Sequence, residues 1–169
     1  TSSHAISNSL GLEDGNNLSI DELLFFVKRI VKAVNIPVSV DIESGYAHEP
    51  SAIAQNIKTL ANLGVVGINL EDSILVNGKR TLVDVNEFTN KLRSIVNILN
   101  EHNVAIFMNI RTDTYVTKHE NALEETIRRG LLYKDAGAEG LFVPLIKDTE
   151  DIKKVIATVG LPLNVFATA

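Results

Sequence analysis

The sequence predicts an α/β domain built on a parallel sheet. Segments with amphipathic helical spacing alternate with short, apolar, β-branched runs, and short connections join them as in a series of βαβ units. Acidic residues directly follow two of the apolar runs: Asp41 and Glu43 end one, and Glu71 and Asp72 end another. Burial in a parallel sheet explains the apolar runs but not the acids, which indicate an acid/base or divalent-metal site.

The first half of the chain predicts two helix–strand pairs. Residues 19–22 form a capping-box pattern, which opens an amphipathic helix with apolar residues from 23 to 34. A strand is expected over residues 37–43. The next helix covers residues 51–63, where a glycine follows, and the next strand covers residues 65–70.

The second half continues the same alternation. Asp84 is the expected N-cap of a helix whose apolar residues recur at helical spacing as far as Leu99. After it we expect, in order, a strand at 104–110, a helix at 121–136, a strand at 140–145, a helix at 149–159 and a strand at 161–166.

Composition narrows the class of protein. The 169 residues, 45% of them hydrophobic, suffice for one domain with its own core, and we assign residues 1–169 to a single α/β domain. The net charge of -5 argues against a nucleic-acid partner, and the apolar runs are too short to span a membrane. There are no cysteines, so disulfides and thiolate sites are excluded. A cytoplasmic location is expected.

Two architectures fit this pattern. Five strands and this length suit a doubly wound sheet, such as a flavin or phosphoacceptor domain, whereas a (β/α)8 TIM barrel normally needs about 200 residues or more. Arg111 and Asp113 directly follow a third apolar run, as the acids follow the first two. These polar strand ends favour the barrel, because all strands of a barrel end at one face. No glycine-rich phosphate turn is present. We therefore expect an incomplete TIM barrel with about five parallel strands.

Five segments carry a resemblance to a known family. The chain resembles the isocitrate lyase and phosphoenolpyruvate mutase superfamily, in the family's order, at residues 1–15, 41–46, 67–72, 109–115 and 136–144. The resemblance implies a (β/α)8 barrel in a homo-oligomer, a dimer or tetramer. It also implies that the chain is a fragment, which lacks the first two strands, the C-terminal strand and the C-terminal helices.

The strand-end acids suit a hard cation such as Mg²⁺, which prefers oxygen ligands. Asp41, Glu43 and Glu71 could supply them. The resemblance implies that Asp41 is the main metal contact, that Glu43 and Glu71 hold metal-bound waters, and that Asp14 on a gating loop approaches the same site. The alternative is that Asp41 and Glu43 cap a helix or pair with a basic residue.

Substrate contacts are expected around the metal. A guanidinium suits an acidic group, and the resemblance gives Arg111 this role, although a structural pair with Asp113 or Glu71 is the alternative. Ser2 and Ser3 match the loop that holds the 2-oxo carboxylate.

Three further positions are expected to contribute to substrate binding. Gly45 would let the backbone approach a ligand and Tyr46 would donate a hydrogen bond, although an ordinary turn explains both. Asn164 is expected at the barrel mouth or in packing.

The family chemistry breaks or makes a bond beside a 2-oxo acid through a pyruvate enolate, with Asp14, Arg111 and Glu71 as catalytic residues. The isocitrate and methylisocitrate lyases carry a Lys-Lys-Cys-Gly-His motif where this chain has a short loop at residues 73–80, and Pro144 stands where phosphonomutases have histidine. Lys79 or Arg80 on this loop could close on the substrate, and a solvated loop charge is the alternative. We expect a Mg²⁺-dependent C–C lyase acting on a small 2-oxo or 2-hydroxy carboxylate. The alternatives are a phosphonomutase-like C–P enzyme and a non-catalytic carboxylate-binding member.

Overall fold

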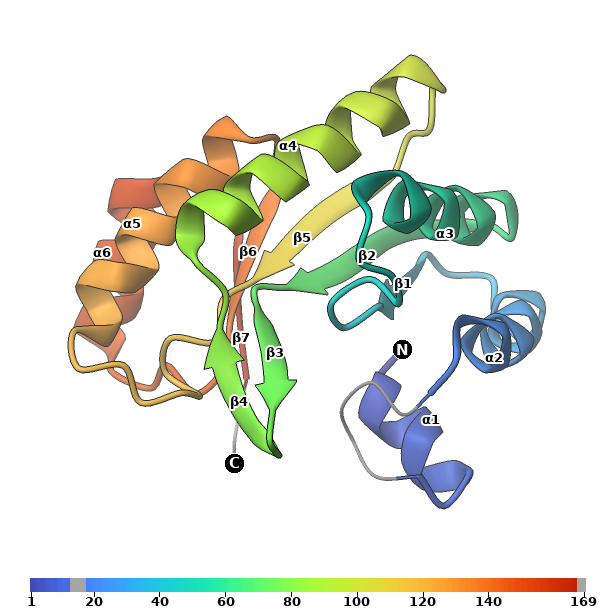
Figure 1. Ribbon diagram of the computed structural model, residues 1–169, viewed down its shortest axis with the longest axis horizontal. Coiled ribbons are helices and arrows are strands. Elements are labelled where there is room, and N and C mark those ends of the chain that lie inside the picture. The colour runs from blue at the N-terminus through green and yellow to red at the C-terminus, as the bar shows by residue number, and fades with distance from the viewer. Residues whose placement is uncertain (13–17, 167–169) are drawn as a thin grey trace.

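A five-stranded parallel sheet forms the centre of the computed structural model, which describes residues 1–12 and 18–166 (Figure 1). Its strands lie in the order β1 (Val38–Asp41), β2 (Val65–Glu71), β5 (Phe107–Arg111), β6 (Gly140–Val143) and β7 (Leu163–Val165). The order in space follows the order along the chain. A doubly wound sheet would reverse this order at a switch point, so the barrel interpretation is confirmed and the doubly wound alternative is wrong.

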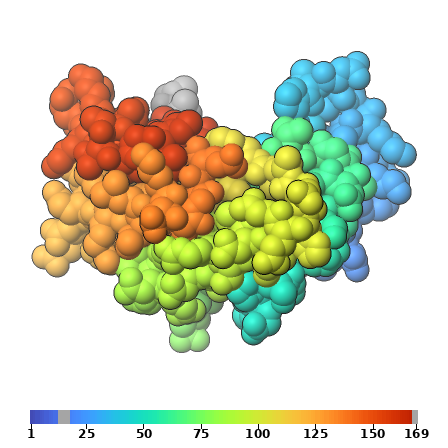
Figure 2. Space-filling model, turned by 90° about the horizontal axis from the view of Figure 1, so that it is seen from above, coloured from blue at the N-terminus to red at the C-terminus, as the bar shows by residue number. Residues whose placement is uncertain are grey.

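Helices alternate with the sheet strands along the chain and cover one face of the sheet (Figure 1). They are α2 (Ile20–Ala33), α3 (Pro50–Asn62), α4 (Val85–Glu101), α5 (Ala122–Asp135) and α6 (Thr149–Val159). In the view from above, the molecule forms an open arc with a hollow between its N-terminal and C-terminal parts (Figure 2). The sheet is therefore a curled segment of a barrel wall. None of the helices in the described ranges has the length and apolar content needed to cross a membrane.

The two faces of the sheet differ in chemistry because side chains alternate along each strand. On β2, Ile68 and Leu70 are buried in the hydrophobic core, whereas Asn69 and Glu71 point to the opposite face and line a cavity there. The polar residues are thus gathered on the concave side, where the strands end.

The helix boundaries agree with the expected ones to within a few residues, because local caps set them. Ser19 and Glu22 form the expected capping box, and the Asp84 side chain accepts hydrogen bonds from two backbone N–H groups of the first turn of α4. Gly160 ends α6 with a φ of 65°, in the left-handed region that glycine adopts without strain.

Two segments expected to be loops are regular. Residues Ser3–Ser9 form the helix α1, with Ser2 as the N-cap whose hydroxyl accepts a hydrogen bond from Ala5 N–H at 3.3 Å. Residues 73–82 form an antiparallel hairpin of β3 (Ser73–Val76) and β4 (Lys79–Leu82). Its turn is Asn77-Gly78, both at positive φ, which is the strongest short hairpin signal in a sequence.

Candidate functional site

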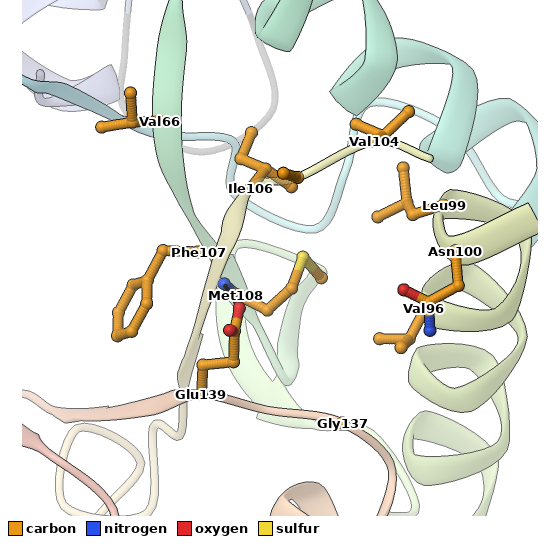
Figure 3. Close-up of a pocket in the computed structure, with 11 residues that line it drawn as sticks. Val66, Val96, Leu99, Asn100, Val104, Ile106, Phe107, Met108, Gly137 and Glu139 are labelled. Atoms are coloured by element: carbon orange, nitrogen blue, oxygen red, sulfur yellow. Dashed lines mark hydrogen bonds between the residues drawn. The ribbon is translucent and has the colours of Figure 1, made fainter. Parts of the chain in front are cut away.

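Two cavities open on opposite ends of the sheet, and their linings differ. The larger, about 570 Å³, lies at the start of β2 and β5 beside the last turns of α4 (Figure 3). Its lining is mostly apolar, and its single carboxylate, Glu139, accepts a hydrogen bond from Met108 N–H at 3.0 Å. Such a lining offers no converging polar groups that could do chemistry.

The second cavity, about 390 Å³, lies at the carboxyl ends of the strands. Six of the residues expected in the site line it, and the list is Ser2, Ser3, Asp41, Glu43, Glu71 and Arg111. They come from the N-terminus and from the ends of β1, β2 and β5, three neighbouring parallel strands. In (β/α)8 enzymes this end of the strands carries the active site, so this cavity is the candidate site.

The turn after β1 is held in a defined geometry. One oxygen of Asp41, Oδ2, accepts a hydrogen bond from the Ser3 hydroxyl at 2.8 Å, and the other, Oδ1, accepts one from Glu43 N–H at 3.1 Å. Glu43 adopts a φ of 48°, which is uncommon for a residue with a side chain, and its carbonyl accepts from Glu71 N–H at 2.8 Å. These bonds fix the Asp41 carboxylate and the Glu43 backbone relative to the end of β2.

The carboxylates of this cavity are potential ligands of a divalent cation. Within residues 1–12 and 18–166, no three His, Asp or Glu side chains are arranged together as ligands of one ion. Mg²⁺, however, keeps several waters and is usually bound by one or two carboxylates together with the substrate. Asp41 and Glu43, two carboxylates on one turn at the cavity wall, fit that mode of binding.

Glu71 lies between two guanidinium groups. Its Oε1 is 2.5 Å from Nη1 of Arg80, and its Oε2 is 3.3 Å from Nη1 of Arg111. Burial raises the pKa of Glu71 to about 7, and the two arginines only partly offset this effect.

Asp113 is a second carboxylate that contacts both arginines. Its side chain is fully buried, and it accepts from Arg111 Nε at 2.6 Å, from the Ser73 hydroxyl at 2.5 Å and from Arg80 Nη1 at 3.3 Å. The structural pairs considered for Arg111 therefore both form, and Arg111 still lines the cavity.

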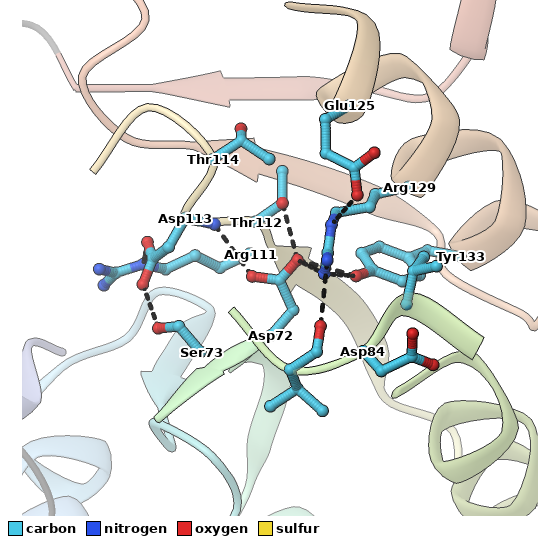
Figure 4. Close-up of polar contacts among 12 residues, drawn as sticks. Asp72, Ser73, Asp84, Arg111, Thr112, Asp113, Thr114, Glu125, Arg129 and Tyr133 are labelled. Atoms are coloured by element: carbon cyan, nitrogen blue, oxygen red, sulfur yellow. Dashed lines mark hydrogen bonds and ion pairs between the residues drawn. The ribbon is translucent and has the colours of Figure 1, made fainter. Parts of the chain in front are cut away.

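A second buried network supports Asp113 (Figure 4). Asp72 accepts hydrogen bonds from Asp113 N–H, the Thr112 hydroxyl and the Tyr133 hydroxyl, and it forms an ion pair with Arg129 at 3.0 Å. Burial raises the pKa of Asp72, whereas Arg129 lowers it. The network ties α5 to the loops after β2 and β5 that carry the site.

Four expected site residues remain. Three of them do not line this cavity, and the fourth lies outside the described ranges. Asp14 lies outside the described residues. A Cβ on Gly45 would lie 2.8 Å from the Ile53 side chain, so close packing requires glycine there. Tyr46 donates to Glu43 at 3.4 Å, and Asn164 donates to Asn109 at 3.0 Å.

Other residues reach the cavity that sequence reasoning did not assign to it. Arg80 was expected either to reach the substrate or to be a solvated loop charge, and the hairpin places it on the wall together with Asn69, Phe142 and Phe166. Asn69 had a usable signal, because residues two apart on a strand share a face and Glu71 was already assigned to the site. For Arg80, the Asn77-Gly78 turn signals a hairpin but does not show which part of the molecule the hairpin contacts.

Comparison with known proteins shows the family. The whole chain, residues 1–169, matches the family described as phosphoenolpyruvate phosphomutase. An uncharacterised protein of Mycobacterium tuberculosis is 34% identical over 164 residues, which cover 97% of this chain and 59% of that protein. The 2,3-dimethylmalate lyase of Eubacterium barkeri is 27% identical over 158 residues, which cover 90% of this chain and 53% of the lyase. The chain thus spans little more than half the length of these relatives.

Solved structures agree with this result. A Burkholderia cenocepacia protein assigned as a phosphonomutase superposes with a TM-score of 0.92 at 33% identity, over 100% of this chain and 69% of that one. Phosphonopyruvate hydrolase, solved as a complex with oxalate and Mg²⁺, shares the fold with a TM-score of 0.80 at 22% identity, over 96% of this chain and 56% of that one. The chain belongs to the phosphoenolpyruvate phosphomutase family, and its curled sheet is part of that family's barrel.

Proposed function

We propose that the protein is a Mg²⁺-dependent lyase that breaks or makes a C–C bond next to the 2-oxo group of a small carboxylate. One observation carries the proposal: carboxylates from the ends of β1 and β2 and a guanidinium from the end of β5 line a single cavity. The similarity to the 2,3-dimethylmalate lyase of Eubacterium barkeri supports the lyase class.

In this proposal Asp41 would be the main contact of Mg²⁺, and Glu43 and Glu71 would hold waters of its shell. Mg²⁺ would stabilise negative charge that develops on the 2-oxo oxygen when the pyruvate enolate forms. The complex of phosphonopyruvate hydrolase with oxalate and Mg²⁺ supports this choice of metal and of ligand chemistry.

The chain's own side chains would position the substrate. Arg111 binds its acidic end, and its guanidinium carbon is 5.7 Å from the centre of the Phe142 ring, a contact that restricts its orientation. Ser3 acts through its hydrogen bond to Asp41, which keeps that carboxylate turned toward the cavity. Asp14, on the expected gating loop, remains part of the proposed catalytic set.

Metal binding is tested first, by calorimetry with oxalate and Mg²⁺. Oxalate should bind only when Mg²⁺ is present, and Asp41→Asn should weaken this binding by about 10-fold or more, the usual effect of disturbing a metal shell. Asp135→Asn is the matched control, because Asp135 is exposed at the end of α5 and does not line the cavity. Equal affinity in the Asp41 variant and the wild type would refute the assignment.

Turnover is tested with oxaloacetate, phosphonopyruvate and substituted malates, each with and without Mg²⁺. Glu71→Gln should abolish turnover, whereas Arg111→Ala should mainly raise KM. Turnover of phosphonopyruvate alone would favour the phosphonomutase-like alternative, which the assigned phosphonomutase among the similar structures supports. Mg²⁺-dependent binding without any product would favour a non-catalytic carboxylate-binding member.

The assembly and the location are also proposals. We infer a homo-oligomer, a dimer or tetramer, from the family resemblance, and we infer a cytoplasmic protein. Light scattering of the full-length protein would test the first, since a monomer at all concentrations contradicts it.

A further inference from the structure

The hairpin β3–β4 carries Arg80 into the candidate site as an ordered element. Arg80 pairs with Leu75 across the hairpin, and Val83 N–H donates to Asp72 O at 2.9 Å where the hairpin rejoins the sheet. The Asn77-Gly78 turn closes it in two residues. The guanidinium is therefore presented by regular backbone pairing that begins directly after Glu71 and Asp72.

The guanidinium of Arg80 is held on one side only. Its Nη1 makes all three of its polar contacts, to Glu71 at 2.5 Å, Ser73 at 2.9 Å and Asp113 at 3.3 Å. Arg111 uses Nε and Nη1 for its ion pairs with Asp113 and Glu71. Across residues 1–12 and 18–166, no hydrogen bond uses Nη2 of either arginine or Nε of Arg80, so donors remain for a ligand.

Charge is distributed unevenly around the cavity. Asp41 and Glu43 stand at the end of β1, whereas Arg80 and Arg111 meet around the ends of β2 and β5. The arginines share Glu71 and Asp113 as partners, and this shared pairing keeps the two guanidinium groups close to each other. Asp41 and Glu43 thus suit a cation, and the unused guanidinium donors suit an anion.

We propose that Arg80 is a specificity-determining residue that binds a second acidic group of the substrate and makes the site prefer dianionic 2-oxo acids. This inference rests on the proposed function. The group it recognises has at least two anionic oxygens, a carboxylate or a phosphonate, because a planar guanidinium donates two parallel N–H bonds to such a group. The 2-oxo carboxylate end of the same molecule faces Asp41 and Glu43.

The test compares one mono-acid with two di-acids. Binding of pyruvate, oxaloacetate and phosphonopyruvate to the full-length protein is measured by calorimetry at saturating Mg²⁺. The wild type should bind at least one di-acid about 10-fold or more tighter than pyruvate, as expected for added hydrogen bonds between charged groups. A preference for oxaloacetate identifies the second group as a carboxylate, and a preference for phosphonopyruvate identifies it as a phosphonate.

Arg80→Met should remove most of this preference, with a loss of about 10-fold to 100-fold for the preferred di-acid and a change of less than about 3-fold for pyruvate. Arg80→Lys should restore part of it, because lysine keeps the charge but not the fork. Lys79→Met is the matched control, since it removes the same charge from an exposed position of the same hairpin and should leave all three affinities unchanged.

The outcomes separate the two proposals. Retained pyruvate binding in Arg80→Met also demonstrates that the variant is folded. An equal loss for all three acids, or no loss for the di-acid, overturns the role of Arg80 and leaves the proposed function standing. Absence of Mg²⁺-dependent binding of every acid to the wild type overturns the proposed function and this inference with it.

Discussion

Replacement of Arg129 by methionine should destabilise the protein strongly. Asp72 is fully buried, and its ion pair with Arg129 spans 3.0 Å. Methionine fills a similar volume but leaves the carboxylate without its positive partner. Removing one member of a buried pair typically costs about 3–5 kcal/mol, because the remaining charge stays desolvated. The loss of the Arg129 hydrogen bond to the Val83 carbonyl, at 3.0 Å, acts in the same direction.

The assay is equilibrium unfolding in urea, with Arg128→Met as the control. Arg128 directly precedes Arg129 on α5 and also pairs with Glu125. Its side chain is 54% exposed, so its loss should cost no more than about 1 kcal/mol. Equal free energies of unfolding for the two variants would refute the claim that the buried pair stabilises the fold.

The pH dependence gives a second check on the same network. Burial raises the pKa of Asp72 above its value in the unfolded chain, and loss of Arg129 should raise it further. The folded variant then binds a proton more tightly than the unfolded chain, so its stability falls as pH rises toward the folded pKa. The penalty of Arg129→Met should therefore be smaller at about pH 5 than at about pH 8. A penalty independent of pH would contradict this mechanism.

Two further predictions concern the concave face. Gly140→Ala should cost about 1–3 kcal/mol in unfolding free energy, because the new Cβ would lie 2.6 Å from Asn109 Oδ1 and 2.9 Å from the Phe107 ring. A change below about 0.5 kcal/mol would mean that the Asn109–Asn164 contact can shift freely. For Glu71, the rise in pKa from 4.5 to about 7 predicts that the metal-free protein loses roughly 3 kcal/mol of stability between these pH values, relative to Glu71→Gln. Parallel pH profiles of the two proteins, measured by urea unfolding, would refute it.

Local patterns were sufficient for most of the secondary structure. The capping box at Ser19 and the N-cap at Asp84 act within a few residues, so helix starts can be read from neighbouring positions. The expected loop at Ser2–Ser3 is instead the start of α1, because the Ser2 side chain caps that helix. The hairpin at 73–82 also has a local signal, since Asn77-Gly78 is typical of a tight turn between two strands.

The sequence by itself determined that Asp41, Glu43, Glu71 and Arg111 would share one edge, because parallel strands all end on the same side of a sheet. Only the tertiary structure decided which partners these side chains meet. Asp72 and Arg129 are 57 residues apart along the chain, and Arg80 reaches Asp113 across 33 residues. Such contacts depend on which strands are neighbours and on how the hairpin folds back, and no periodicity or cap within a short window encodes that arrangement.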